Sequence, residues 1–327
     1  MDLVKQPGVK LSFRKEEFEI VYHSYVCKDS GEQFTNETLD RINLTQIHNK
    51  YREKYGIPFP EEIKSIREQY GTSASKMSEI LGFGTNSYRL YESGEIPSVA
   101  NGRLILAVKH PKDFIKQVEA SSHLLDEKEK LKYLTRAEQL LEEHRRRAFE
   151  IQLSRHIFKS EYADRFSGYR SPGFRRIANM IRFFSERAGY VFKTKLNKLL
   201  FYADFGHFKR SGFSISGLSY RAIQMGPVPS AYGLLYDKLA NDELIEITNI
   251  PFSDGNYGEA LVGLTSFEDR LFNESELTVL NLVAEQFSGL RASEIIELSH
   301  QESAWIDNEK DRSLISYPEY AFELKGL

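Results

Sequence analysis

The chain has 327 residues, of which 41% are hydrophobic, and its net charge is -3. This length exceeds what one hydrophobic core usually fills, so two or three domains of about 100 to 150 residues are expected. No stretch approaches the roughly 20 apolar residues of a membrane-spanning helix, and the first residues lack the apolar core of a signal peptide. We therefore expect a cytoplasmic protein that does not contact a membrane. The single cysteine, Cys27, excludes an intrachain disulfide and an all-cysteine zinc site.

The charge is distributed unevenly along the chain. Between Arg165 and Arg221, twelve basic residues stand against only Glu186 and Asp204. After Asn241 the acidic residues dominate. Such segregation favours an interaction surface of one sign, folded against a compensating half, over a free nucleic-acid-binding tail.

The first part of the chain combines a strand pattern with a helix pattern. Residues 9–34 alternate apolar and polar side chains, and Asp-Ser-Gly at 29–31 is typical of a turn, so this segment predicts a β-hairpin. Apolar residues at helical spacing predict a helix over 36–55, which Gly56 ends. We therefore predict a small β and helical N-terminal module at residues 1–56.

From Pro60 to about residue 120 the pattern predicts short helices separated by glycines, and we assign a domain to residues 57–120. Two of these helices flank Gly82, where a tight turn needs a positive φ, and this is the layout of a two-helix DNA reader. In such a motif the start of the second helix approaches base edges, and the start of the first touches phosphates. The predicted DNA-contacting residues are Thr85, Asn86, Ser87 and Arg89 for bases, and Ser73, Ser75 and Lys76 for phosphates.

The recognition segment resembles a known family. It reads GFGTNSYRLYESGEIPS, and over residues 60–120 the chain is similar to the helix-turn-helix of phage repressors and, more narrowly, of MqsA-type antitoxins. Gly84 stands where a Ser or Thr cap is usual. A helical module that binds only protein is the alternative. MqsA-type antitoxins carry a zinc module, but here His23 and Cys27 supply at most two of about four ligands, so we expect no metal.

Residues 121–170 are predicted to connect this domain to the next. A leucine stripe among charged residues predicts one or two long helices up to about Arg165, with a connecting or coiled packing role. The stripe consists of Leu124, Leu125, Leu131, Leu134, Leu140 and Leu141. Ser-Pro-Gly at 171–173 then breaks the chain and opens a last domain at residues 171–327.

Four motifs mark this last domain. They read KLNKLLFYAD at 195–204, GLSYR at 217–221, GPVP at 226–229 and LSHQESAW at 298–305. Together with the apolar run at 177–184 and with Tyr232, they resemble the Panacea domain, also called the SocA-like antitoxin domain. The resemblance implies an antitoxin, of the PanA type, that neutralises a toxin by direct binding. Panacea antitoxins pair with many unrelated toxins, often alarmone-synthetase-like ones, and SocA is an adaptor that delivers its toxin to a protease.

The residues also indicate a binding surface without the family. The apolar positions of the first motif form one helical face, with its lysines largely off that face, and two prolines pin a loop beside tyrosine and arginine. The alternative is that these are ordinary core helices and a structural turn. The predicted toxin-contacting residues are Arg175, Arg182, Lys195, Lys198, Tyr220, Arg221, Pro227, Pro229 and Tyr232.

No catalytic pattern stands out, so we expect no enzyme and no cofactor. The sequence lacks a P-loop, an HExxH motif and the third glycine of a dinucleotide fingerprint. Asp204 and His207, three apart on a predicted helix, could share a ligand, but no third partner is evident and a structural pair is favoured. Ser299 and His300 are sequence neighbours and point in different directions on a helix.

We therefore expect a mainly α (α+β) fold and an antitoxin of a toxin-antitoxin system. Its partners would be a cognate toxin and operator DNA, and it would form a homodimer or a toxin-antitoxin hetero-oligomer. A transcriptional regulator with a protein-sensing C-terminal domain, and a proteolytic adaptor, are the alternatives. The sequence does not identify the toxin or the operator.

Overall fold

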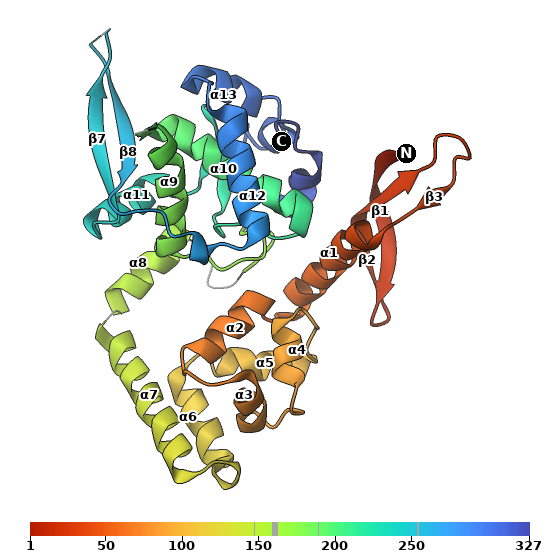
Figure 1. Cartoon of the computed structure of the whole chain (residues 1–327), viewed down its shortest axis with the longest axis vertical. Helices are drawn as coiled ribbons and strands as arrows, with labels where there is room; N and C mark the ends of the chain where they lie inside the picture. Colours follow the sequence, from red (N-terminus) through yellow and green to blue (C-terminus); the bar gives the residue numbers. More distant parts are fainter. Residues whose placement is uncertain (147, 159–162, 189, 254) are drawn as a thin grey trace. The chain divides into compact units, whose positions relative to one another are not determined.

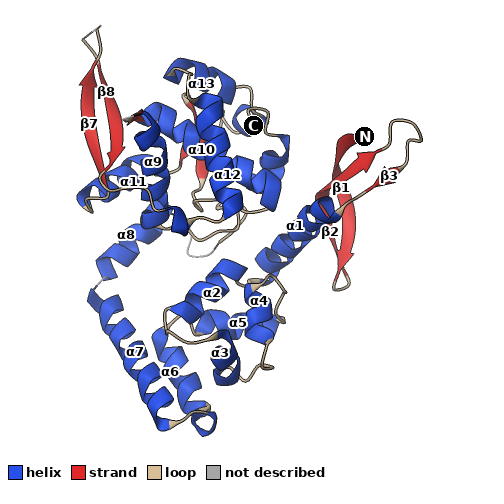
Figure 2. Cartoon of the chain, in the orientation of Figure 1, coloured by secondary structure: helices blue, strands red, loops and turns tan. Residues whose placement is uncertain are grey.

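The computed structural model describes residues 1–146, 148–158, 163–188, 190–253 and 255–327 (Figure 1). Helices dominate this part of the chain, with small sheets at its N-terminal end and in its C-terminal half (Figure 2). The predicted mainly α fold with α+β parts is thus confirmed. Contacts divide the described residues into two compact units: Met1–Val4, His23–Thr45 and Ile157–Leu327 in one, and Lys5–Tyr22 and Gln46–His156 in the other. In the described ranges, no helix combines the length and the apolar composition needed to cross a membrane.

The N-terminal end is a β-hairpin followed by a helix. The strands are β1 (Asp2–Phe13), β2 (Glu16–Val26) and β3 (Gln33–Phe34), in the sheet order β1-β2-β3. The predicted turn at 29–31 connects β2 to β3, but the tight hairpin turn lies at Arg14 and Lys15, both with positive φ. Positive φ at both central residues is typical of the type I′ turn, whose twist matches that of the paired strands. Arginine and lysine do not favour positive φ, so the sequence does not predict this turn.

Helix α1 (Glu37–Tyr55) packs its apolar face on the hairpin. Ile47 and Tyr51 share a buried cluster with Phe18 and Ile20 of β2. Two amide side chains tie the helix to the strand: Gln46 exchanges hydrogen bonds with the backbone of Val21, and Asn43 does so with His23. The helix ends before Gly56 at φ +60°, as predicted.

The next part of the chain is a bundle of short helices around one core, which we call the helical bundle. Its helices are α2 (Pro60–Glu68), α3 (Ala74–Ile80), α4 (Ser87–Glu92), α5 (Val99–Ala107), α6 (Pro111–Ala120), the turn η1 (Ser122–Leu124) and α7 (Glu127–Arg146). Tyr70 stacks on Phe114 with ring centroids 3.6 Å apart, and its hydroxyl donates to the carbonyl of Val108 at 2.6 Å. Tyr88 is fully buried, and its hydroxyl donates to the carbonyl of Ile63 at 2.8 Å. These tyrosines satisfy their polar ends inside an otherwise apolar core.

Helix α7 closes the bundle with part of the predicted leucine stripe: Leu140 is buried together with Leu125, and Leu134 packs against the same core. Tyr133, Ala137 and Leu140 are buried against the bundle, at the spacing of one helical face. Leu124 and Leu131 are instead exposed. The chain continues as α8 (Ala148–Phe158), and the predicted connector residues 147 and 159–162 lie outside the described residues.

The remainder, Ile157–Leu327, we call the C-terminal region. Its helices are α9 (Phe174–Ala188), α10 (Lys193–Ser211), α11 (Tyr232–Asn241), α12 (Glu274–Phe287), α13 (Ala292–Ser299), α14 (Ser303–Ile306) and α15 (Tyr317–Tyr320), with short turns η2 (Asp269–Leu271) and η3 (Ala321–Glu323). Its strands are β4 (Val191–Phe192), β5 (Tyr220–Ile223), β6 (Gly226–Pro229), β7 (Ile245–Pro251) and β8 (Tyr257–Gly263). They form an antiparallel sheet of order β4-β8-β7 and the separate hairpin β5-β6.

Helix α10 is the centre of the C-terminal region. Every residue from Leu196 to Phe208 is buried, so the helix has no solvent face over this stretch. It packs on α9, α12, α13, β6 and η3 (Figure 1). A helix surrounded in this way must satisfy each of its polar side chains inside the protein.

Candidate functional site

Asp204 forms the polar centre around which α10 and the β5–β6 hairpin are joined. Its carboxylate accepts hydrogen bonds from the amides of Ile215 and Ser216, at 2.8 and 2.7 Å, and from the hydroxyls of Ser216 and Tyr220. Burial raises the pKa of this carboxyl, and the hydrogen bonds from Ser216, Tyr220 and Ile215 act in the opposite direction. His207 has separate partners, since its Nδ1 lies 2.7 Å from the carbonyl oxygen of Phe213. Asp204 and His207 therefore have structural partners of their own.

Lys198 is also buried within this region. It has no exposed surface, and its Nζ donates to the carbonyl of Pro227 at 3.0 Å. Burial lowers the pKa of the Lys198 ammonium to about 7. Gly226, at φ +90°, lies against the lysine so closely that a Cβ there would be 2.6 Å from Lys198 Cε. Lys198 thus ties the GPVP loop to α10, and the positive φ together with the close lysine favours glycine at position 226.

The last motif closes the same assembly. The indole of Trp305 donates to the carbonyl of Ile223 at 2.8 Å, and the His300 ring stacks on it at 3.9 Å. Glu302 accepts hydrogen bonds from Tyr202 of α10 and from the backbone amides of Lys325 and Gly326. The four sequence motifs therefore meet in one interior network.

This network changes the interpretation of the predicted toxin-contacting residues. Arg182, Lys198, Tyr220, Pro227 and Pro229 are buried, so these side chains are not available to contact another protein. The prediction that the lysines of α10 lie largely off its apolar face is wrong for Lys198, because the helix is enclosed on all sides. Part of the predicted set does reach the surface: Arg175, paired with Glu268; Arg221, donating to the carbonyl of Arg312; Lys195; and Tyr232.

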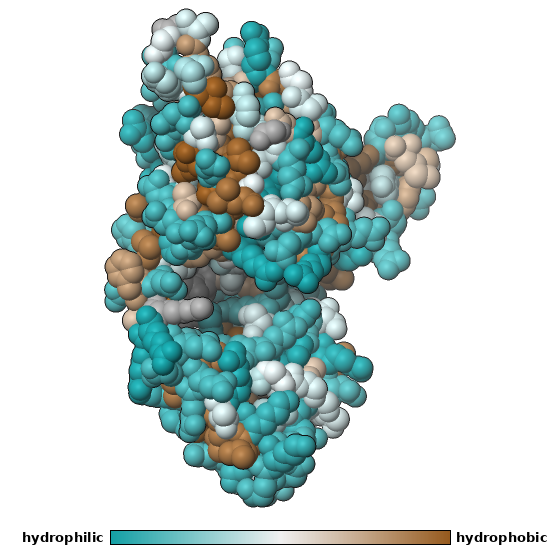
Figure 3. Space-filling model, turned by 60° about the vertical axis from the view of Figure 1, so that its left-hand side comes forward, coloured by the Kyte–Doolittle hydropathy of each residue, from teal (hydrophilic) through white to brown (hydrophobic). Residues whose placement is uncertain are grey.

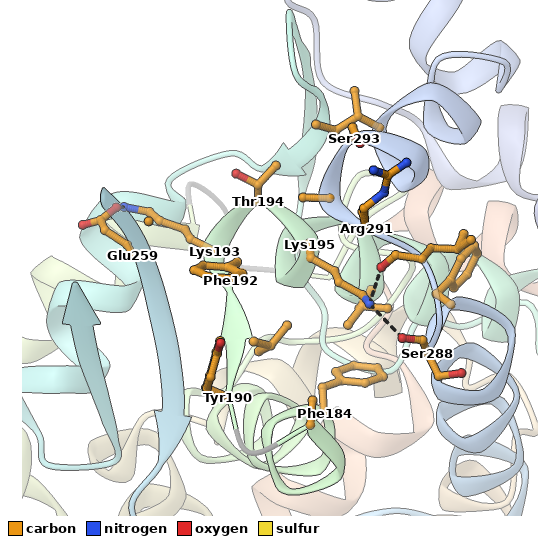
Figure 4. A pocket seen from close by; sticks show the side chains of 18 of the residues that line it. Phe184, Tyr190, Phe192, Lys193, Thr194, Lys195, Glu259, Ser288, Arg291 and Ser293 are labelled. Atoms are coloured by element: carbon orange, nitrogen blue, oxygen red, sulfur yellow. Dashed lines mark hydrogen bonds and ion pairs between the residues drawn. The ribbon is translucent and has the colours of Figure 1, made fainter. Parts of the chain in front are cut away.

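A cleft of about 920 Å³ opens beside the first turn of α10 (Figure 4). Its walls come from the end of α9, from β4, from the β7–β8 hairpin and from the α12–α13 junction. Phe184, Leu199, Phe287 and Ile296 contribute apolar side chains. On the hairpin side, the rings of Phe192 and Phe252 lie 5.3 Å apart. The cleft is within the size range of sites that bury small ligands or partner side chains.

The cleft carries more positive than negative charge. Lys195 Nζ reaches across it to the carbonyls of Ser288 and Leu290, at 3.3 and 2.7 Å, and holds the end of α12 (Figure 4). Lys193 pairs with Glu259 at 2.6 Å. The lining residues also include Arg187 and Arg291, so four cationic side chains accompany one carboxylate among them. Of the predicted residues, Lys195 is the one that lines this cleft.

Large apolar side chains surround the mouth of the cleft without covering it. Tyr190, Met225, Phe252 and Tyr257 all line it and are exposed, Tyr257 to 70%. In a space-filling view, hydrophobic side chains, drawn in brown, gather on one face of the upper half of the picture (Figure 3). Contiguous exposed apolar surface of this kind commonly marks a site of interaction with another macromolecule.

The predicted DNA-contacting residues lie on α3, on α4 and on the turn between them. Gly82 has φ +68°, as the predicted turn requires, and Ser73 caps α3 by accepting from the Lys76 amide. Helix α4 begins at Ser87, so Thr85 and Asn86 precede the helix and do not form its first turn. Thr85, Asn86 and Arg89 are exposed, as are Ser73 and Ser75, while Ser87 is half-buried. Lys76 is half-buried and pairs with Glu79 and Glu129.

One part of the chain matches a known protein family. Residues 196–306, about a third of the sequence, match the family described as the antitoxin SocA-like Panacea domain. This stretch runs from α10 to α14 and contains the Asp204 network and much of the cleft. Comparisons with curated proteins and with solved structures give no match. The match lies within the C-terminal region and does not extend to the helical bundle.

Sequence reasoning missed most of the cleft. Arg187 and Lys193 belong to the basic stretch between Arg165 and Arg221, but Tyr190, Phe252 and Tyr257 are not among the predicted residues. The sequence does contain a signal for the hairpin: Phe252 and Tyr257 flank Asp-Gly-Asn, a sequence typical of a hairpin turn. What the sequence could not show is that this hairpin faces the first turn of α10.

Proposed function

We propose that this protein is an antitoxin that binds and silences a toxin protein through its C-terminal region. The observation that carries the proposal is the Panacea match, which covers the α10-centred assembly. The structure supplies a rigid scaffold, because its polar centre is fully buried and hydrogen-bonded. The same region presents a cleft with exposed aromatic residues, which suits protein binding better than chemistry.

The test is direct neutralisation. The full chain is co-expressed, and separately mixed as pure protein, with the product of the neighbouring gene. Restored growth, together with a stable complex and loss of toxin activity in the purified mixture, supports direct binding. A toxin that is silenced in cells only when a protease is present, and never in the purified mixture, would instead favour a proteolytic adaptor.

We further propose that the helical bundle represses the operon that encodes the protein. The support is the exposed set Thr85, Asn86 and Arg89 beside the Gly82 turn, because Asn and Arg can each make paired hydrogen bonds to a base. Two copies would bind a palindromic operator. The measurement is binding of the full chain to its own promoter fragment, with unrelated DNA as the control.

A transcriptional regulator that senses another protein is the second candidate. The same two features favour it, since an exposed DNA-facing helix and a protein-binding cleft would lie in one chain. It differs in one respect: the partner would change promoter binding without itself being a toxin. Expression of the neighbouring gene alone decides, because growth arrest identifies a toxin.

A further inference from the structure

We infer that the cleft beside the first turn of α10 is where the toxin docks, through a segment that carries large apolar side chains flanked by carboxylates. The inference rests on the proposed function and names the surface and the chemistry of its partner. The predicted toxin contacts Lys198 and Tyr220 are buried, whereas the residues around this cleft form a surface that another protein can reach.

The apolar part of the partner follows from the shape and exposure of the cleft. Its floor is built of phenylalanine and leucine side chains, and a volume of about 920 Å³ accepts several side chains at once. Tyr257 and Met225 at the rim are 70% and 48% exposed, so apolar surface extends outward from the floor. A protein segment covers floor and rim together, and aromatic, methionine and arginine residues are those enriched in protein interfaces.

The acidic part follows from charge. Four cations line the cleft; Glu259 in the lining pairs with Lys193, and Glu294 beside the cleft pairs with Arg291, so cations still outnumber carboxylates. Arg291 projects into solvent with 81% of its side chain exposed, and it pairs with Glu294 at 3.3 Å. Exposed pairs of this kind contribute little to stability, so a partner carboxylate can exchange with Glu294 at small cost. A segment with acidic flanks therefore complements this rim and speeds correct encounter.

The cleft is also built to hold its shape. Lys195 ties α10 to the α12–α13 junction through two carbonyls. On the opposite wall, Gly258 lets two rings pack against the strand: a Cβ there would lie 2.7 Å from the Phe192 ring. A site fixed before binding loses little conformational freedom when it is occupied.

The experiment measures binding of the purified full chain to the product of the neighbouring gene, with variants of the rim. Met225→Glu places a charge at the apolar mouth, and Arg291→Glu reverses a rim charge. Two matched controls lie outside the cleft lining: Leu234→Glu, where the residue is 46% exposed against 48% for Met225, and Arg270→Glu, whose side chain is 77% exposed and likewise paired with one glutamate. Thermal melting confirms that all four variants stay folded.

We expect each rim variant to weaken binding at least tenfold, while the controls bind like the wild type. We also expect a Glu→Lys or Asp→Lys change in the toxin segment to restore binding to Arg291→Glu. Wild-type affinity in both rim variants, alongside a wild-type chain that binds, would overturn the docking site and leave the antitoxin function standing. A wild-type chain that does not bind the toxin overturns both. Loss of self-association in the rim variants, with toxin binding intact, identifies a second copy as the occupant and overturns the inference.

Discussion

The most informative single perturbation is Lys198→Met. Lys198 has no exposed surface, and burial lowers the pKa of its ammonium from 10.5 to about 7. The unfolded chain keeps the ordinary pKa, so between about pH 7 and 10.5 the unfolded state binds more protons than the folded state. Stability must therefore rise with pH in this window, and the penalty is largest below about pH 7, where the folded protein has to bury the charge.

The size of the effect follows from the pKa difference. Each unit is worth about 1.4 kcal/mol, so burying the charged form costs about 5 kcal/mol at low pH. Between about pH 6 and pH 9 roughly half of this penalty is relieved, and the wild type should gain about 2 to 3 kcal/mol relative to Lys198→Met. Lys198→Met also removes the donor to the carbonyl of Pro227. This loss destabilises the variant by about 1 to 3 kcal/mol at every pH and therefore does not change the slope of the difference with pH.

The assay is denaturant unfolding of both proteins at several pH values, with the difference in unfolding free energy plotted against pH. A flat difference would refute the reasoning, because it would mean that Lys198 has the same pKa folded and unfolded. Toxin binding provides an independent check on the same variant. It should persist in Lys198→Met, since a buried lysine that serves the scaffold makes no direct contact.

Three further predictions test the scaffold and the helical bundle. Asp204→Ala should destabilise the protein by about 3 to 5 kcal/mol, because it leaves several buried donors without an acceptor. Tyr220→Phe removes only one of these donors and should cost about 1 to 2 kcal/mol. Equal losses of unfolding free energy in denaturant melts would contradict the role of Asp204 as the polar centre. Gly226→Ala should lower the melting temperature, because the Cβ meets Lys198 and the backbone has a positive φ; an unchanged melt would show that the loop yields freely. Asn86→Ala and Arg89→Ala should each weaken operator binding by about 1 to 3 kcal/mol, measured by titration with the promoter fragment, and leave toxin neutralisation intact. Wild-type affinity for the promoter in both variants would exclude α4 from the DNA interface.

The sequence predicted the helices of the bundle well because their limits are local. Gly71, Gly82 and Gly94 all have positive φ, and each follows the end of a bundle helix within a few residues. A glycine after an apolar-periodic segment is sufficient to predict such an end. The hairpin turn at Arg14 and Lys15 escaped prediction because neither residue type favours positive φ.

The candidate site was predicted far less well, for reasons of distance. Apolar periodicity predicts which side of a helix is buried when one face is exposed. Helix α10 is buried on all sides from Leu196 to Phe208, so periodicity does not predict that its polar residues are buried. Lys198 finds its acceptor at Pro227, 29 residues further along the chain. The cleft joins segments near residues 190, 255 and 290, and only tertiary packing brings them together.

The burial of the Asp204 network has a consequence for how new specificities can arise. Because the Asp204 network lies in the interior, we expect that residues around the cleft mouth can be exchanged while the fold is kept. Randomising Met225, Phe252, Tyr257 and Arg291 should yield well-folded variants, some of which recognise toxins that the parent ignores. One fold would then support the binding of different partner proteins.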